Sequence, residues 1–205
     1  MIRRLLSRIF GKRFVKFQAR FLLWNQRTNQ FAQFEDIRLC DLSYGGPDFK
    51  RVLIGALQLL KDIDPRRFLR VNRHLKWIAN EPLAQPGAQY RHLTQTCSFD
   101  FVKPESESDI PFWIANHASV LVHEATHGVL RVRGIPYSPE LRARIEHLCV
   151  TEQNRFARRL ATSQPEIAER LHREFDESEW HDSWDRTNTG TLIATLRRIH
   201  RGRHK

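Results

Sequence analysis

Residues 123–127 read His-Glu-Ala-Thr-His, with two histidines four residues apart and a glutamate directly after the first. In a helix, His123 and His127 lie one turn apart on the same face, so both imidazoles can bind one Zn²⁺. Glu124 then points beside the metal, where its carboxylate can take a proton from metal-bound water, whose pKa the metal lowers to about 7. The spacing predicts metal-assisted hydrolysis with Glu124 as general base.

The residues around this motif are uncharged and mostly apolar, which indicates a buried helix. Apolar residues fill positions 120–122 before the motif and 129–130 after it. Two imidazoles and a carboxylate without partners in a core would cost about 1–3 kcal/mol or more each. A bound metal removes that cost, so the context favours a metal site over a structural helix whose histidines pair with local acids.

The motif and its flanks resemble the zincin metallopeptidases, and the resemblance covers residues 116–157. A metzincin would continue as HExxHxxGxxH, but the positions after His127 hold no histidine at that spacing. The resemblance is therefore to the gluzincin type, in which a glutamate from the next helix is the third ligand. It implies a zinc-dependent peptide hydrolase with His123 and His127 as ligands, and it leaves Glu146 and Glu152 as candidates for the third.

Helix geometry distinguishes these two glutamates. If the motif helix ends near Val132 and the next helix begins near Pro139, residues at the same level in the antiparallel pair have numbers that sum to about 271. The metal would lie level with residue 125, so its partner level is about residue 146. We therefore expect Glu146 to be the ligand. Glu152 is expected to orient His123 or to replace Glu146 as ligand, and either glutamate could instead form a surface ion pair.

Two further residues are candidates through the resemblance alone. Gluzincin enzymes stabilise the oxyanion with a tyrosine or histidine outside the motif, and the available residues here are Tyr137, after the motif helix, and His181, in the patch at 180–184. Each also has a plainer interpretation, which is packing for Tyr137 and a surface position for His181.

Helical periodicity supplies the elements that must position these residues. It predicts helices over 48–61, 65–78, 119–131 and from about 139 to 160, and a short one after 163–165. Asp64 followed by Pro65 is a typical helix start. Alternation from Tyr90 to Val102 predicts one strand, which by analogy with zincins could pair with an extended substrate. We expect a mainly α (α+β) domain in which the motif helix packs antiparallel on the following helix.

The formal charge of +11 is concentrated at the two ends of the 205-residue chain. Residues 1–34 carry eight bases and no acid, and residues 197–205 carry five more bases and no acid, which leaves 21 bases against 23 acids between them. The pattern divides the chain into a basic amphipathic helical segment, 1–34, a single globular domain, 35–196, and a basic tail, 197–205. Composition therefore gives the central domain no preference for polyanions.

The basic ends suggest another class of function, a peripheral membrane protein or a nucleic-acid binding protein in which any metal site is structural. A third class is a metal-bound fold without catalysis that serves as a protein-interaction module. Nucleic acid is disfavoured because the basic segments contain no zinc finger, RNA-binding sheet motif or helix-turn-helix. An anionic membrane surface, met through residues 1–28, is the better partner for this alternative, whereas the hydrolase would take a peptide or protein.

The remaining expectations concern the compartment. No apolar run approaches the ~18 residues of a membrane span, and no secretory signal is recognisable. The three cysteines, Cys40, Cys97 and Cys149, are far apart and have no CxxC spacing, which predicts neither a disulfide framework nor a cysteine zinc site. We expect a cytoplasmic protein that can contact a membrane surface.

Overall fold

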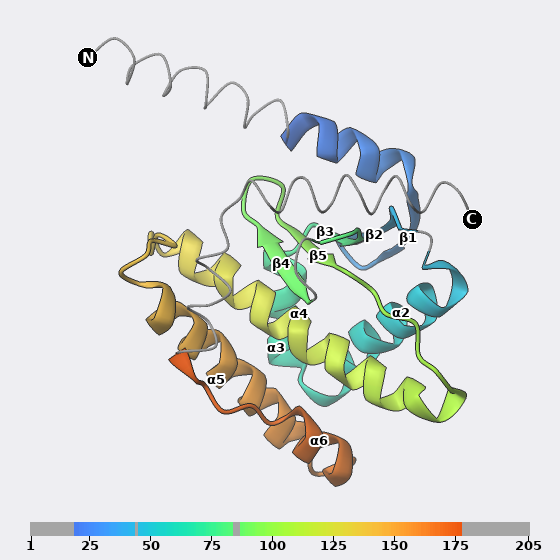
Figure 1. Ribbon diagram of the computed structural model, residues 1–205, viewed down its shortest axis with the longest axis vertical. Helices are drawn as coiled ribbons and strands as arrows, with labels where there is room; N and C mark the ends of the chain where they lie inside the picture. Colours follow the sequence, from blue (N-terminus) through green and yellow to red (C-terminus); the bar gives the residue numbers. More distant parts are fainter. Residues whose placement is uncertain (1–18, 44, 84–86, 178–205) are drawn as a thin grey trace.

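The computed structural model describes residues 19–43, 45–83 and 87–177, and within them the fold is mainly α with one small sheet. Figure 1 shows most helices gathered on one face of the sheet, with a separate helix, residues 19–28, across the opposite face. The class expected from the sequence, α+β with a predominance of helix, is confirmed.

The sheet has five short strands in the order β1-β2-β3-β5-β4. The two central pairings, β2 with β3 and β3 with β5, are parallel, and both outer pairings are antiparallel. Strand β4 therefore forms one edge. The strands are β1 (Gln30–Phe34), β2 (Ile37–Asp41), β3 (Trp77–Asn80), β4 (Ala88–Arg91) and β5 (Thr96–Phe99).

Side-chain alternation gives this sheet two different faces. Leu39, Ile78 and Cys97 are paired across β2, β3 and β5, and all three are buried in the main core beneath the helices. Trp77 and its neighbours on the other face form a smaller cluster, against which Leu23 of the 19–28 helix packs. Because successive residues of a strand point to opposite faces, the sheet is covered on both sides.

The helices are α2 (Gly46–Ile63), α3 (Pro65–His74), α4 (Ile110–Val132), α5 (Arg142–Leu160) and α6 (Pro165–Leu171), with a 3₁₀ turn at Glu107–Asp109. Asp64 caps α3 as expected, because its side chain accepts a hydrogen bond from the backbone N–H of Arg67 at 3.1 Å and Pro65 opens the helix.

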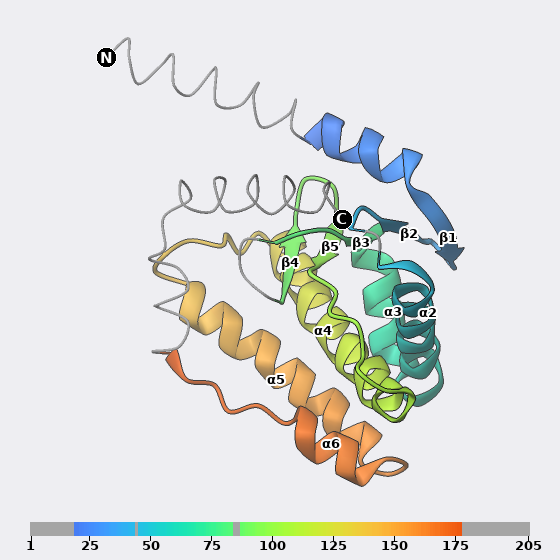
Figure 2. The same ribbon diagram turned by 45° about the vertical axis from the view of Figure 1, so that its right-hand side comes forward.

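Helix α4 is the centre of the molecule. It packs against α2, α3, α5 and α6 and against strands β4 and β5. Figures 1 and 2 show α5 running antiparallel to α4 along its outer side, as the sequence predicts. The motif at residues 123–127 lies in the second half of α4, so these helices and strands surround it.

Three expectations about local structure were wrong. The alternating segment from Tyr90 to Val102 contains the second half of a β4–β5 hairpin, because the chain turns at residues 92–95, where Gln95 has a positive φ of 51°. The helix expected to reach Ile78 ends at His74, where Leu75 becomes extended, and strand β3 follows. Strands β1 and β2 had not been predicted, and β1 lies within the expected helical segment 1–34.

The basic N-terminal segment is described from residue 19 onward. Residues 19–28 are helical and pack on the sheet through Leu23 and Gln26, whose side-chain amide donates to Thr96 at 3.2 Å. The first 18 residues, and the expected tail at 197–205, lie outside the described residues. None of the described helices combines the length and the apolar character that crossing a bilayer requires.

Candidate metal centre

Helices α4 and α5 bring three of the sequence-predicted ligands together. His123 and His127 lie on the face of α4 that meets α5, and Glu146 approaches from the first turns of α5. Glu146 Oε2 is 3.1 Å from His123 Nε2, and Glu146 Oε1 is 3.7 Å from His127 Nε2. One ligand atom from each of these residues and from Cys149 forms a set in which all atoms lie within 4.8 Å of one another.

Three separations within this set are close to those between the ligands of a tetrahedral metal ion. Zn²⁺ binds nitrogen, oxygen and sulfur at about 2.0–2.3 Å, so neighbouring ligands in a tetrahedron lie roughly 3.4 Å apart. The His123–Glu146, His127–Glu146 and His127–Cys149 separations of 3.1, 3.7 and 3.7 Å lie on either side of that value. The donor set of imidazole, carboxylate and thiol is also the one that zinc prefers.

Surrounding polar groups hold these side chains in position. Nδ1 of His123 donates to the amide oxygen of Gln153 at 2.8 Å, which leaves Nε2 directed toward Glu146. Gln153 in turn donates to the hydroxyl of Ser119 at 3.3 Å. Such an outer partner fixes the tautomer and orientation of a ligating histidine. The sequence analysis had assigned this role to Glu152, whereas the structure has Gln153 in that position.

The charges around the cluster favour a cation at its centre. Burial alone would lower the pKa of His123, but the hydrogen bond with Glu146 and the charges of Glu124 and Glu146 raise it. Burial, reinforced by the charge of His123, lowers the pKa of His127 to about 4. Burial opposes ionisation of Glu146, yet its contacts with the two histidines lower its pKa. An ionised carboxylate beside a neutral imidazole is suited to metal binding.

The carboxylate of Glu124 reaches the edge of the sheet while it still feels the charges of His123 and Glu146. Its carboxylate accepts a hydrogen bond from the backbone N–H of Tyr90 in β4, and only 5% of the residue is exposed. Burial raises the pKa of Glu124 to about 7, with His123 opposing this rise and Glu146 adding to it. A carboxyl group with a pKa near neutrality can both accept and return a proton at physiological pH.

Sequence reasoning missed Cys149, whose Sγ lies 3.7 Å from Nε2 of His127. The absence of CxxC spacing argued against cysteine ligands, but a single thiol needs no such spacing when the other ligands come from histidine and glutamate. The signal in the sequence is its place three residues after Glu146, on the same face of α5. Burial, followed by the charges of Glu146 and Glu124, raises the pKa of the thiol, which a coordinated metal would deprotonate.

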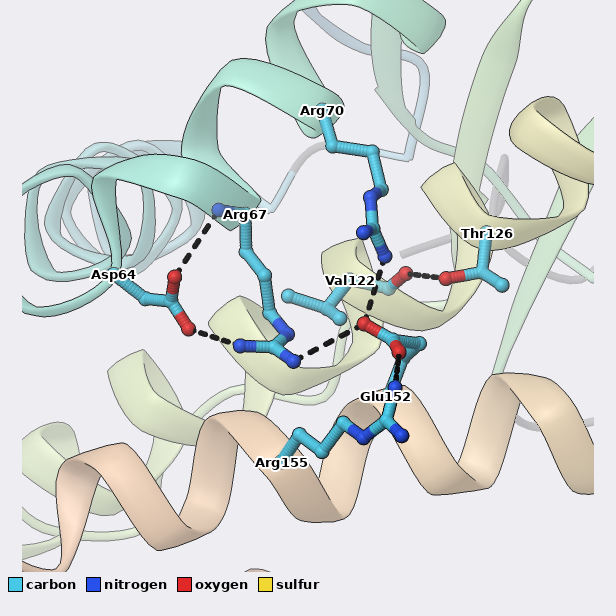
Figure 3. A network of polar contacts seen from close by, with 7 residues as sticks. All are labelled: Asp64, Arg67, Arg70, Val122, Thr126, Glu152 and Arg155. Carbon is cyan, nitrogen blue, oxygen red and sulfur yellow. Dashed lines mark hydrogen bonds and ion pairs between the residues drawn. The ribbon is translucent and has the colours of Figure 1, made fainter.

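Glu152, the alternative ligand, lies in a different environment. Figure 3 shows its carboxylate surrounded by the guanidinium groups of Arg67, Arg70 and Arg155. The three nitrogen–oxygen distances are 3.1, 2.7 and 2.5 Å. Burial opposes its ionisation, but these hydrogen bonds and charges lower the pKa of Glu152. Its carboxylate therefore belongs to an ion-pair network between α3 and α5. An ion pair was one of the roles expected for Glu152, and Arg155 is one of its partners.

The two candidates for oxyanion stabilisation have different outcomes. The hydroxyl of Tyr137 donates to Oε1 of Glu146 at 2.6 Å, and its ring lies 5.6 Å from that of His127. Tyr137 is 48% exposed, so it lies at the solvent side of the cluster, in contact with a candidate ligand. His181 lies outside the described residues.

Comparisons with known proteins give no further identification of this site. No protein-family model, no curated protein and no solved structure matches the chain.

Proposed function

We propose that this protein is a zinc-dependent hydrolase that cleaves peptide bonds. The observation that carries the proposal is the convergence of His123, His127 and Glu146 at one point between two helices, with Glu124 next to His123 in the chain and its carboxylate within the influence of the charges of His123 and Glu146. Such a cluster combines three ligands for one metal ion with a separate general base, the composition of catalytic zinc sites that keep one position open.

The roles of the protein's own groups follow from their positions. A zinc ion held by the three ligands would polarise the scissile carbonyl and lower the pKa of water in the site. Glu124 takes the proton that the attacking water loses and delivers it to the nitrogen of the leaving amine, so no net proton is gained or lost by the enzyme. Tyr137 holds Glu146 through its hydroxyl, and Gln153 holds His123 through its amide oxygen.

Strand β4 provides a place for an extended substrate. Among the described residues it pairs with no strand other than β5, so apart from the N–H of Tyr90, which donates to Glu124, its outer edge can pair with a further strand. The N–H of Tyr90 on this strand contacts Glu124, which places the proposed base next to that edge. A peptide that extended the sheet there would pass close to the cluster, and this supports a polypeptide as the substrate class.

The test combines metal content with turnover. Purified protein should contain about one zinc per chain and should cleave a mixed peptide library, with products identified by mass spectrometry. Glu124→Gln should keep the zinc and lose turnover, because the amide cannot accept the proton. Undiminished cleavage by Glu124→Gln, or a native fold of equal stability with and without metal, would overturn the proposal.

Cys149 supports a second candidate, a structural zinc site. If the thiolate joins the two histidines and Glu146, four protein ligands complete the tetrahedron and leave no position for water. Cobalt substitution separates the two cases, because a bound thiolate adds an intense sulfur-to-cobalt band that Cys149→Ser removes. Peptide cleavage that survives Cys149→Ser favours the hydrolase, whereas the thiolate band together with no cleavage favours the structural site.

A surface feature supports membrane contact as the role of a protein with such a structural site. Phe21 and Trp24 are 57% and 61% exposed on the 19–28 helix, with ring centroids 6.0 Å apart. Exposed aromatic residues beside basic ones are typical of helices that lie on anionic bilayers. Binding to anionic liposomes that is lost in a Phe21→Ser, Trp24→Ser double variant would support this alternative, and a wild-type protein that does not bind them would exclude it.

A further inference from the structure

A second site is built from arginines of α3 and of the C-terminal half of α5. A cavity of about 430 Å³ lies between α3 and α5. None of the four residues of the metal cluster lines it, and its nearest lining residue along α5, Glu152, is bound to the arginines of α3 and α5, so the cavity is separate from the cluster. Its lining consists of six arginines and two acids, namely Asp64, Arg66, Arg67, Arg70, Glu152, Arg155, Arg158 and Arg159.

The acids leave most of this positive charge uncompensated. Asp64 pairs with Arg67, and Glu152 accepts hydrogen bonds from Arg67, Arg70 and Arg155. The lining therefore carries a net charge of +4. The dipole at the C-terminal end of α5 is worth only about half of one negative charge, so it does not balance the remainder.

Three arginines are available to a ligand. Arg66, Arg158 and Arg159 are exposed, and no acidic partner is found for them in the part of the chain that the structure describes. They surround a floor that Glu152 holds in place, as Figure 3 shows for the guanidinium groups that meet it. Within that floor, Nε of Arg67 is buried and has no hydrogen-bond acceptor among the described residues.

Chemistry and size indicate the ligand. Guanidinium groups match phosphate oxygens in bidentate geometry, and arginine is the usual residue for this recognition. The volume is in the range of small-molecule sites and exceeds what one phosphate fills. A neighbouring hollow of about 380 Å³ shares Arg66 and Arg70 with it. The other residues that line this hollow are the apolar Leu69, Val129 and Val132 and the basic Arg73, His74 and Arg133.

We propose that the arginine cavity binds a compact ligand carrying several phosphate groups. Three or four negative charges offset the +4 of the lining, which a single phosphate does not. The shared walls of the neighbouring hollow provide room for an organic group attached to the phosphates. The inference does not depend on the proposed hydrolase, because no zinc ligand lines the cavity.

The test is calorimetric titration of the full-length protein with inorganic tripolyphosphate at constant ionic strength. We expect saturable 1:1 binding that is weakened about tenfold or more by Arg158→Ala and by Arg66→Ala, because each removes a charge-assisted hydrogen bond. Arg158→Lys should recover only part of the affinity, since lysine keeps the charge but not the fork. A parallel titration with a nucleoside triphosphate distinguishes an inorganic polyphosphate from a phosphorylated organic ligand. If the organic group uses the neighbouring hollow, the nucleoside triphosphate binds more tightly than tripolyphosphate.

The matched control is Arg144→Ala, which removes the same charge from an exposed position near the other end of α5. It should leave the dissociation constant within about twofold of wild type, because a charge more than a Debye length from the ligand is screened. Equal weakening by Arg144→Ala and Arg158→Ala would reduce the effect to general electrostatics and overturn the proposal. Binding that no cavity variant changes, or that occurs with duplex DNA and not with tripolyphosphate, would overturn it as well.

Discussion

Glutamine replacements of Glu146 and Glu152 remove the same charge from the same helix, yet we predict opposite consequences. Glu146 lies within 4 Å of both histidines, so Glu146→Gln removes one of the three proposed metal ligands. Glu152 is bound to three arginines, so Glu152→Gln leaves the metal cluster intact and disrupts the contact between α3 and α5.

The magnitudes follow from these contacts. Structural zinc sites with four ligands bind with about 10–16 kcal/mol, so one ligand is worth roughly 2.5–4 kcal/mol, or about 100- to 1000-fold in zinc affinity. Breaking a buried ion pair costs about 3–5 kcal/mol. Because Arg155 is half exposed and its pair is screened by solvent, we reduce the cost of Glu152→Gln to about 2–3 kcal/mol of unfolding free energy.

Two assays separate the effects. Competition with a chromophoric chelator gives the zinc affinity of each variant, and urea unfolding in excess chelator gives the stability of the metal-free proteins. Glu146→Gln should lose zinc affinity, whereas Glu152→Gln should keep it and unfold at lower urea. A loss of zinc affinity in Glu152→Gln as large as in Glu146→Gln would refute the assignment of Glu146 as the ligand.

Three more predictions concern residues around the centre. Gln153→Met keeps the side-chain volume but removes the acceptor for His123, and chelator competition should show zinc affinity about 10–100-fold weaker, while equal affinity would contradict its orienting role. Burial lowers the pKa of His117 to about 4, so between pH 6.5 and pH 4 the unfolded chain binds a proton at His117 that the native chain does not. The free energy of unfolding therefore falls as the pH drops from 6.5 toward 4, by up to about 3 kcal/mol from this residue. Urea unfolding at pH 7 and pH 4 should show this extra loss in wild type and not in His117→Phe, and equal losses would be inconsistent with it. Gly128→Ala would place a Cβ 2.8 Å from Cβ of His74. The cost of overpacking should exceed the gain in helix propensity and lower the free energy of unfolding by about 1–2 kcal/mol. Thermal unfolding of this variant at or above the wild-type temperature would count against the close contact.

The sequence predicts those ligands of the candidate metal centre whose positions follow from the geometry of one helix or of an antiparallel helix pair. The four-residue spacing places His123 and His127 on one face, and equal rise along antiparallel α4 and α5 brings Glu146 level with them. Both inferences need only the regular geometry of helices, and the structure has these three side chains together.

The remaining parts depend on packing that no local pattern records. Cys149 and Gln153 read as ordinary members of α5, and their roles appear only when the rotation of α5 against α4 is known. The hairpin of β4 and β5 was predicted as one strand because alternation continues through its turn, where Gln95 adopts a positive φ without glycine. The arginine cavity was hidden because a near-neutral total for the central domain says nothing about where its charges gather.

The central position of α4 has a kinetic consequence. Its candidate ligands lie in the interface with α5. Three side chains approach Glu146, namely His123 and His127 of α4 and Tyr137 of the following loop, and only Tyr137 is substantially exposed. A metal ion bound in the proposed site would be open to solvent past Tyr137 and enclosed by the two helices on its other sides. A chelator can then attack the ion directly, so the rate of metal removal should rise with the chelator concentration, whereas a constant rate would mean that the ion leaves only when the helix pair opens.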